Sequence, residues 1–203
     1  MNLYGSAVIL AGGKSTRMGF DKQFLQVQDR TIVQHLISHL GKRFTDIMVS
    51  SATPKLYDPG QVRVIKDIYK DVGPLGGIHA ALQGAKSEAV FVIACDMPYL
   101  EIPYIDFMMD EMKKGSWDAC VTARGDHLEV FHSFYCRSAL EVLEGELAAE
   151  RYSVQRFTRK IKALIIPEAS AAPYLPEWRA FTNINTPEEY AKFRSATGDG
   201  WEV

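Results

Sequence analysis

The chain has 203 residues, of which 47% are hydrophobic and 24% are charged, and its formal net charge is -2. This length and composition are typical of one globular domain and exclude a disordered body. The nearly balanced charge argues against a general nucleic-acid binder and against a protein of the membrane surface. No stretch approaches the ~20 consecutive apolar residues of a membrane span, and the first residues lack the basic region of a signal peptide.

The cysteines give a further indication of the compartment. Cys95, Cys120 and Cys136 form no CxxC pair and are too few for a disulfide framework. We expect buried, reduced thiols, which are typical of a protein of the cytoplasm.

The first predicted elements are a buried strand over 6–10 and a helix over 31–41, with a glycine-rich loop between them. Thr31 and Gln34 have the spacing of a capping box, and the apolar residues that follow share one helix face. Two more strands are predicted over 45–50 and 62–66.

In the middle of the chain we predict a short helix over 77–86, opened by a run of glycines at 73, 76 and 77. An almost wholly apolar strand follows over 89–95, as expected in the centre of a sheet that is covered on both faces. This strand ends at Asp96, because Pro98 cannot continue a ladder of hydrogen bonds.

Strands and helices alternate as far as the C-terminus. We predict helices over 103–114, 137–149 and 187–195, and strands over 118–123, 128–135 and 163–166. The alternation predicts a three-layer α/β/α, Rossmann-like fold with a mostly parallel sheet, to which the segment 115–137 adds a short antiparallel edge. We assign residues 1–195 to a single domain and 196–203 to a loose C-terminal tail.

The loop after the first strand reads LAGGKSTRMGFDK over residues 10–22. Its glycines allow a ligand to approach the backbone closely, and its cations are Lys14, Arg17 and Lys22. Exposed amides and converging cations suit a polyphosphate. A P-loop is excluded because Val8 stands where that motif needs glycine, and the GxGxxG pattern is absent as well.

This loop resembles the signature of nucleotidyltransferases with the nucleotide-diphospho-sugar transferase-like fold, and in particular that of the molybdenum cofactor guanylyltransferase family. Three later segments carry the same resemblance: GPLGGI at 73–78, CDMP at 95–98 and NINTPEE at 183–189. The similarity covers essentially the whole chain, and the four motifs occur in order.

The resemblance implies a role for each candidate site residue. Lys22 and Arg17 act in catalysis together with Asp96, which also ligates Mg²⁺. Asn183 and Asn185 lie near the second substrate and the metal. The predicted binding residues are Leu10, Ala11, Gly12, Gly13, Lys14, Lys22, Asp67, Gly73, Gly76, Asp96, Asn183 and Asn185.

Structural alternatives accompany several of these assignments. Asp96 could cap the segment that follows it, and Asp67 could bond to its own backbone in a loop. In the segment that begins Thr186-Pro187, we favour an ordinary helix start for Thr186 and the glutamates after it.

The chain also departs from the family pattern. Ser50 and Ser51 stand where relatives often have an asparagine near the nucleotide, and the segment 127–135 replaces a familiar proline-containing stretch. His127 and His132 are candidate acceptor contacts or structural histidines. The basic residues Arg151, Arg156, Arg159 and Lys160 are candidates for the acceptor's phosphate or for a solvated helix face.

The function that the resemblance implies is transfer of GMP from GTP to the terminal phosphate of molybdopterin, with release of pyrophosphate. The alternatives are a cytidylyltransferase of the same fold, which uses CTP, and a non-catalytic nucleotide-binding regulator. The resemblance also implies transient contact with other cofactor-synthesis proteins or apo-molybdoenzymes. It implies neither a nucleic-acid nor a membrane partner.

Overall fold

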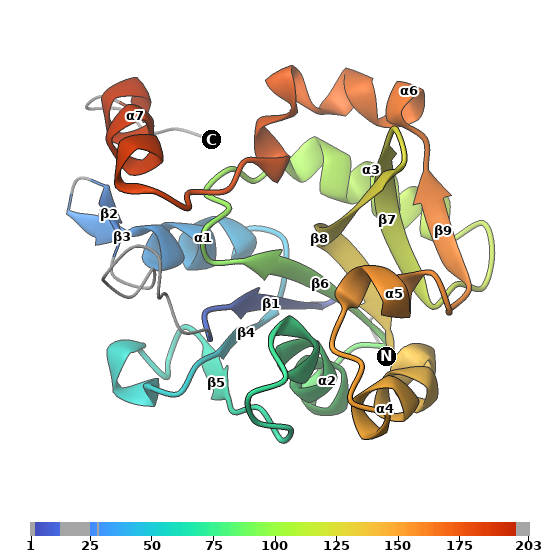
Figure 1. The fold of residues 1–203 in the computed structure, drawn as a ribbon. Coiled ribbons are helices and arrows are strands. Elements are labelled where there is room, and N and C mark those ends of the chain that lie inside the picture. The colour runs from blue at the N-terminus through green and yellow to red at the C-terminus, as the bar shows by residue number, and fades with distance from the viewer. Residues whose placement is uncertain (1–2, 13–24, 28, 198–203) are drawn as a thin grey trace.

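The computed structural model describes residues 3–12, 25–27 and 29–197, and its described strands form a large and a small sheet (Figure 1). The large sheet contains β1 (Ser6–Leu10), β4 (Asp46–Ser50), β5 (Arg63–Ile65), β6 (Ala89–Ala94), β7 (Ala119–Arg124), β8 (His127–Cys136) and β9 (Ala163–Ile166). The small sheet pairs β2 (Gln26–Val27) with β3 (Arg30–Thr31).

The strands of the large sheet lie in the order β5-β4-β1-β6-β8-β7-β9. Only β8 runs antiparallel to its neighbours among these strands, and it lies inside the sheet between β6 and β7. The other pairs are parallel, so β1, β4, β5 and β6 all end at the same edge. The predicted mostly parallel sheet is thereby confirmed, but the prediction of a short antiparallel edge is wrong, because the antiparallel strand lies inside the sheet.

Helices cover both faces of this sheet. They are α1 (Ile32–Leu40), α2 (Pro74–Gly84), α3 (Ile102–Met112), α4 (Leu140–Ala148), α5 (Val154–Thr158), α6 (Glu168–Ala171) and α7 (Pro187–Thr197). Figure 1 shows α1 and α3 on one side of the sheet and α2, α4 and α5 on the other. The three predicted layers are confirmed.

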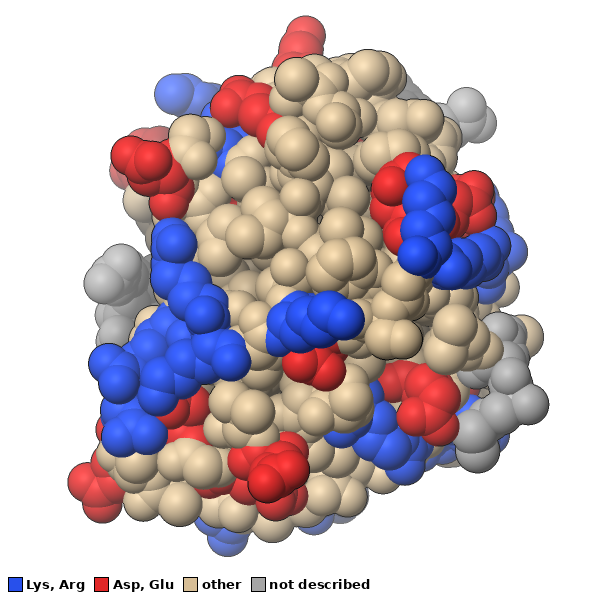
Figure 2. Space-filling model, turned by 90° about the vertical axis from the view of Figure 1, so that its right-hand side faces the viewer, with Lys and Arg blue, Asp and Glu red and all other residues tan. Residues whose placement is uncertain are grey.

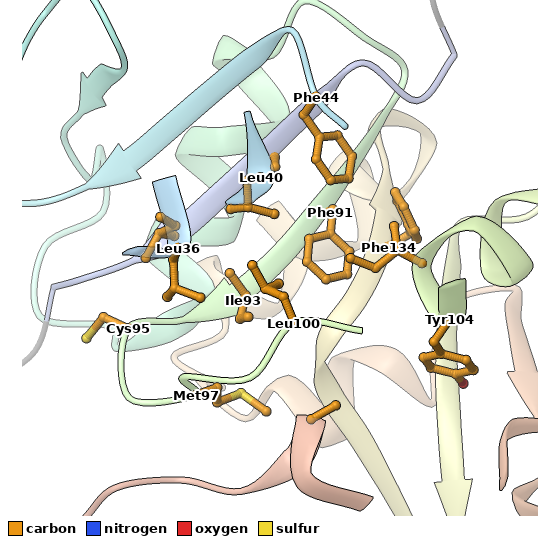
Figure 3. Packing of buried hydrophobic residues seen from close by; sticks show 14 of the residues in the cluster. Leu36, Leu40, Phe44, Phe91, Ile93, Cys95, Met97, Leu100, Tyr104 and Phe134 are labelled. Atoms are coloured by element: carbon orange, nitrogen blue, oxygen red, sulfur yellow. The ribbon is translucent and has the colours of Figure 1, made fainter. Parts of the chain in front are cut away.

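Successive residues of each buried strand point alternately into two hydrophobic cores, one on each face of the large sheet. In β1, Ala7 and Ile9 face the core that α1 and α3 complete, whereas Val8 and Leu10 face the core of α2, α4 and α5. All five residues of β1 are buried, which explains why the four that follow Ser6 are apolar. Figure 3 shows the first core, where Leu36 and Leu40 of α1 approach Phe91 and Ile93 of β6.

Local sequence signals account for most of the element boundaries. The Thr31 hydroxyl accepts a hydrogen bond from the Gln34 amide, and the Gln34 side chain accepts one from the Thr31 amide, so the predicted capping box is confirmed. The predicted start of the second helix at residue 77 is wrong, because α2 begins at Pro74, a residue suited to a first helical turn. The glycines at 76 and 77 therefore lie inside the helix.

The structure also contains short elements that periodicity did not predict, namely α5, α6, β2 and β3. The last helix reaches Thr197, two residues into the predicted tail, and the rest of that tail lies outside the described residues. None of the described helices is both long and apolar enough to cross a bilayer. The three cysteines, all in described segments, form no disulfide, and Cys95 and Cys120 are buried as predicted.

Candidate functional site

The candidate site lies at the edge of the sheet where β1, β4, β5 and β6 end. Beyond β1, the Ala11 amide donates to the Ser50 carbonyl over 3.0 Å, and the Cys95 amide donates to the Leu10 carbonyl over 3.0 Å. These two bonds join the ends of three neighbouring strands. Leu10 and Ala11 are themselves buried, whereas Gly12 is exposed at the rim.

Ser50, Asp67 and the glycines of α2 form one corner of this site. The Ser50 hydroxyl donates a 2.6 Å hydrogen bond to Oδ1 of the half-buried Asp67. A Cβ placed on Gly76 would lie 2.8 Å from the Tyr69 carbonyl oxygen and 3.2 Å from Oδ2 of Asp67. The corner therefore requires glycine at 76 to bring the helix against the loop that carries Asp67.

The N-terminus of α2 opens onto the same corner. Gly73 is exposed and has a φ of 68°, a left-handed conformation that a side chain disfavours, and the helix follows immediately. Further along α2, a Cβ on Gly77 would lie only 2.7 Å from Cδ2 of Leu10. The positive end of a helix this close to the end of β1 suits an anionic ligand.

The turn after β6 brings Asp96 to the opposite side of the site. Figure 3 shows Cys95 and Met97 on this turn, and Met97 and Leu100 are each 2% exposed, so the turn is anchored in the core. Asp96, between Cys95 and Met97, is half-buried. Its carbonyl accepts a 2.9 Å hydrogen bond from the amide of Ile184.

That bond brings the C-terminal asparagines to Asp96. Ile184 is 1% exposed, and the residues on either side of it, Asn183 and Asn185, are exposed. The amide of Asn185 donates to the Glu189 carboxylate over 2.7 Å. Segments whose residues Asp96 and Asn185 are 89 positions apart in the sequence therefore lie side by side at one edge.

The donor set at this edge fits a magnesium ion. No group of three or more His, Cys, Asp or Glu side chains that could hold a metal lies within the described segments. A site with one protein carboxylate suits Mg²⁺, which keeps several waters and shares phosphate oxygens with its substrate. Asp96 supplies a carboxylate, and the segment bonded to its backbone carries two asparagines, whose side-chain carbonyls are also oxygen donors.

Four of the predicted site residues lie outside the described segments: Gly13, Lys14, Arg17 and Lys22. The remaining predicted residues surround the carboxyl edge from two sides. Leu10, Ala11, Gly12, Asp67, Gly73 and Gly76 lie toward α2, and Asp96, Asn183 and Asn185 lie toward the C-terminal segment.

Other candidate residues have structural partners. Thr186 caps α7, since its hydroxyl accepts from the Glu189 amide over 3.1 Å while Glu189 accepts from the Thr186 amide over 3.0 Å. His132 is fully buried, so an acceptor contact is excluded for it. His127 is exposed, and its Nε2 lies 3.4 Å from the side-chain nitrogen of Gln155.

The basic segment is held by a single acidic residue. Arg151 and Arg156 lie 2.8 Å and 3.1 Å from the carboxylate of Glu146, and Lys160 donates to it as well. The Glu146 side chain is only 3% exposed, and these hydrogen bonds lower its pKa from 4.5 to about 2. Figure 2 shows the face on the right-hand side of Figure 1, where basic and acidic side chains lie beside one another. These three cations are therefore paired with one buried carboxylate, while their own side chains stay 39–53% exposed.

Two features of the site were not predicted from the sequence. The Ser50 hydroxyl had been noted only as a departure from the family, and its bond to Asp67 links two residues separated by 17 positions. Glu101 and Arg179 form an ion pair across 78 positions. A charged residue that immediately precedes a helix after CDMP was the one sequence signal available for Glu101.

The comparison with known proteins decides the family. Residues 7–164 match the family described as the MobA-like NTP transferase domain. This chain belongs to that family. A MobA-like chain is a nucleotidyltransferase, and the matched region includes β1, Asp67, α2 and Asp96. Asn183 and Asn185 lie beyond it.

Relatives of the MobA-like family resemble the chain over most of its length. It is 43% identical over 191 residues to the molybdenum cofactor guanylyltransferase of Syntrophotalea carbinolica, covering 94% of this chain and 91% of the relative. It is 38% identical to a probable molybdenum cofactor guanylyltransferase of Peptoclostridium acidaminophilum, covering 96% and 90%. Both matches extend beyond the family region toward the C-terminus.

Solved structures share the fold. Molybdopterin-guanine dinucleotide biosynthesis protein A from Archaeoglobus fulgidus has a TM-score of 0.83 and 23% identity, covering 94% of this chain and 97% of its own. The 2-C-methyl-D-erythritol 4-phosphate cytidylyltransferase from Thermus thermophilus has a TM-score of 0.65 and 12% identity, covering 94% and 97%. The same MobA-like architecture thus occurs in proteins named for different nucleotides.

Proposed function

We propose that this MobA-like chain transfers GMP from GTP to the terminal phosphate of molybdopterin, releasing pyrophosphate and forming the guanine dinucleotide form of the cofactor. The observation that carries the proposal is the 43% identity, over 94% of the chain, to a protein named molybdenum cofactor guanylyltransferase. The clustering of polar residues at one edge of the sheet supports it, because ligands of such sheets bind there.

The proposed chemistry needs no general base. A phosphate nucleophile is already ionised at neutral pH, so it can attack the α-phosphorus of GTP while the bond to pyrophosphate breaks. Catalysis then depends on alignment of the two substrates and on neutralisation of the developing charge. We assign the triphosphate to Lys14, Arg17 and Lys22, and the acceptor to the side of Asn183 and Asn185.

In this proposal Asp96, with Asn183 and Asn185 beside it, holds Mg²⁺. When bound there, the ion would supply positive charge to the phosphate oxygens of the nucleotide. The protein's own contribution is to keep the carboxylate of Asp96 at a fixed position, which the burial of Met97 and Leu100 supports. A fixed carboxylate loses little free energy to reorganisation during the reaction.

Recognition of guanine is assigned to the corner formed by Gly12, Ser50, Asp67 and α2. The Leu10 carbonyl and the Ala11 amide already form hydrogen bonds to neighbouring strands. We therefore assign main-chain contacts with the base to the backbone groups from Gly12 onward. A carboxylate such as Asp67 can accept from the N1 and N2 positions of guanine, which both donate. Cytosine presents a different edge and a smaller ring.

One experiment tests this function against its alternatives. Pyrophosphate release is measured with each of the four nucleoside triphosphates, with and without molybdopterin. We expect release only when GTP and molybdopterin are both present, with a preference over CTP of at least ~100-fold in kcat/KM, since a mismatched edge leaves buried polar groups unpaired. Equal kcat/KM for GTP and CTP contradicts the guanylyltransferase assignment and favours a cytidylyltransferase. Nucleotide binding without release under any condition favours a regulator.

The setting of the reaction is also part of the proposal. We expect it to occur in the cytoplasm, because the cysteines form no disulfide. We also propose transient contacts with other cofactor-synthesis proteins or apo-molybdoenzymes, which would receive the product.

A further inference from the structure

The turn that carries Asp96 is joined to the C-terminal segment by more than the bond to Ile184. The Arg179 Nε donates a 2.8 Å hydrogen bond to Oε1 of Glu101, five residues after Asp96. The Arg179 guanidinium also lies 5.6 Å from the centre of the Tyr99 ring. Residues 96–101 and 179–184 are therefore held together at both ends.

The ion pair between Arg179 and Glu101 lies partly away from water. The Glu101 side chain is 10% exposed and that of Arg179 is 42% exposed. A carboxylate this buried is stable as an anion only while it is paired, and removal of its partner leaves a charge without compensation. Loss of Arg179 is therefore expected to displace the turn around Glu101.

The backbone just before Arg179 is in a costly conformation. Glu177 and Trp178 are consecutive left-handed residues, with φ of 53° and 58°. The Trp178 ring has two neighbours, since it stacks on Phe181 with a centroid distance of 6.1 Å and the Arg124 guanidinium lies 5.2 Å from its centre. Strain of this kind persists only where the surroundings determine it, and it concentrates near functional sites.

We infer that Glu101 and Arg179 are positioning residues, which act by holding Asn183 and Asn185 beside Asp96. Neither residue has to touch a substrate for this role. The pair fixes one end of residues 179–184 and the Ile184 amide fixes the other, so the backbone that carries the two exposed asparagines is held against the turn of Asp96. The link to metal binding rests on the proposed function, in which Asp96 holds Mg²⁺.

A first measurement tests the geometry alone. Hydrogen–deuterium exchange of the substrate-free protein is followed in the peptides that cover 95–101 and 181–186. Arg179→Gln keeps much of the side-chain volume and removes the charge, and we expect exchange in both peptides to accelerate about 10-fold. Arg179→Lys keeps the charge and should restore most of the protection.

The matched control is another arginine that is paired to a carboxylate of α3, the helix that follows Glu101. Arg43 lies 2.5 Å from Asp106 of α3, with side chains 34% and 48% exposed. Arg43→Gln should leave exchange in both peptides unchanged. Unchanged exchange in Arg179→Gln, or equal acceleration in Arg43→Gln, overturns the inference.

A second measurement tests the link to the reaction. The Mg²⁺ concentration for half-maximal turnover should rise about 10-fold in Arg179→Gln, as is usual when support of a metal ligand is lost, and Arg179→Lys should recover it. Faster exchange with an unchanged Mg²⁺ response overturns the positioning role. If Asp96→Asn itself retains the wild-type Mg²⁺ response, the metal assignment of the proposed function fails, while the exchange experiment still reports on the ion pair.

Discussion

Lys22 is the residue whose charge we expect to matter most to turnover. In the proposed reaction it neutralises the triphosphate as pyrophosphate leaves. We predict that Lys22→Ala lowers kcat more than ~100-fold, a loss on the order of 3 kcal/mol of transition-state stabilisation. The melting temperature should not change, because the sequence predicts Lys22 to lie in a glycine-rich loop, where a charged side chain contributes little to a core. Lys42→Ala, which removes an exposed lysine after α1, is the control, and wild-type turnover in folded Lys22→Ala contradicts the assignment.

Asp96 is the residue on which the metal assignment depends. Asp96→Asn keeps the shape of the side chain and removes the charge that attracts Mg²⁺. We predict that turnover collapses and that its dependence on Mg²⁺ concentration shifts, whereas nucleotide binding without metal weakens only modestly. Asp110→Asn, at an exposed position on α3, should behave as wild type. An unaltered Mg²⁺ titration would move the metal elsewhere, with Asp67 as the next candidate.

Two glycines at the site should respond differently to alanine. At Gly76 a Cβ would lie 2.8 Å from a backbone carbonyl, so overpacking of about 1–3 kcal/mol exceeds the ~1 kcal/mol gained in helix propensity. Gly76→Ala should therefore melt at a lower temperature. At Gly12 the nearest atom is 3.8 Å away, so Gly12→Ala should keep its melting temperature and lose part of its GTP preference. Thermal unfolding and kcat/KM for GTP and CTP test both; equal melting temperatures would refute the steric argument.

The sequence could predict which residue types surround the site, but not which of them pair. Asp96 was found because an apolar strand ends at it, and that signal is local. The bonds of Ser50 to Asp67 and of Arg179 to Glu101 join residues 17 and 78 positions apart, so they exist only after the strands and the C-terminal segment are in place. Neither pair leaves a periodic pattern that a single sequence can show.

Element prediction was reliable where local signals agreed and failed where packing decided. The capping box at Thr31 and the apolar runs of β1 and β6 located those elements closely. The start of α2 was misplaced because glycine disfavours helix, whereas the close approach to Tyr69 and Leu10 leaves room for no other residue there. The helix α5 has only five residues, and the burial of Phe157 stabilises it more than any propensity.

The connection between α4 and α5 depends on Glu146. Its carboxylate gathers Arg151, Arg156 and Lys160, so Glu146→Gln should leave three cations facing one another and lower the melting temperature. Because the pKa of Glu146 is about 2 instead of 4.5, its contribution is complete above pH 4.5 and is lost as the pH falls toward 2. Glu141→Gln, on the exposed face of α4, should have little effect at any pH. Identical melting temperatures for Glu146→Gln and the wild type would show that the cluster adds no stability.

The stability of the whole domain should fall in mild acid because of a buried histidine. His132 lies among the rings of Phe91, Tyr104 and Phe181, and neither ring nitrogen has a hydrogen-bond partner in the described part of the chain. Burial lowers the pKa of His132 from 6.5 to about 4. The unfolded chain therefore binds a proton that the folded protein does not bind between these two values. The stabilising contribution of the neutral ring is complete above pH 6.5 and declines as the pH falls to about 4.

His132→Phe separates this effect from the rest of the titration. The variant keeps an aromatic ring among Phe91, Tyr104 and Phe181 and has no ring nitrogen to protonate there. Its free energy of unfolding should therefore decrease less between pH 6.5 and pH 4 than that of the wild type. The difference between them should reach on the order of 3 kcal/mol, the value of the pKa shift at 1.36 kcal/mol per unit. His35, whose pKa is lowered to about 3 mainly by burial, acts in the same direction and remains in both proteins. As a control, His127→Gln, at an exposed position, should leave the dependence of the free energy of unfolding on pH unchanged. Urea unfolding at intervals across this range is the measurement, and parallel curves for His132→Phe and the wild type would mean that His132 is protonated in the folded protein.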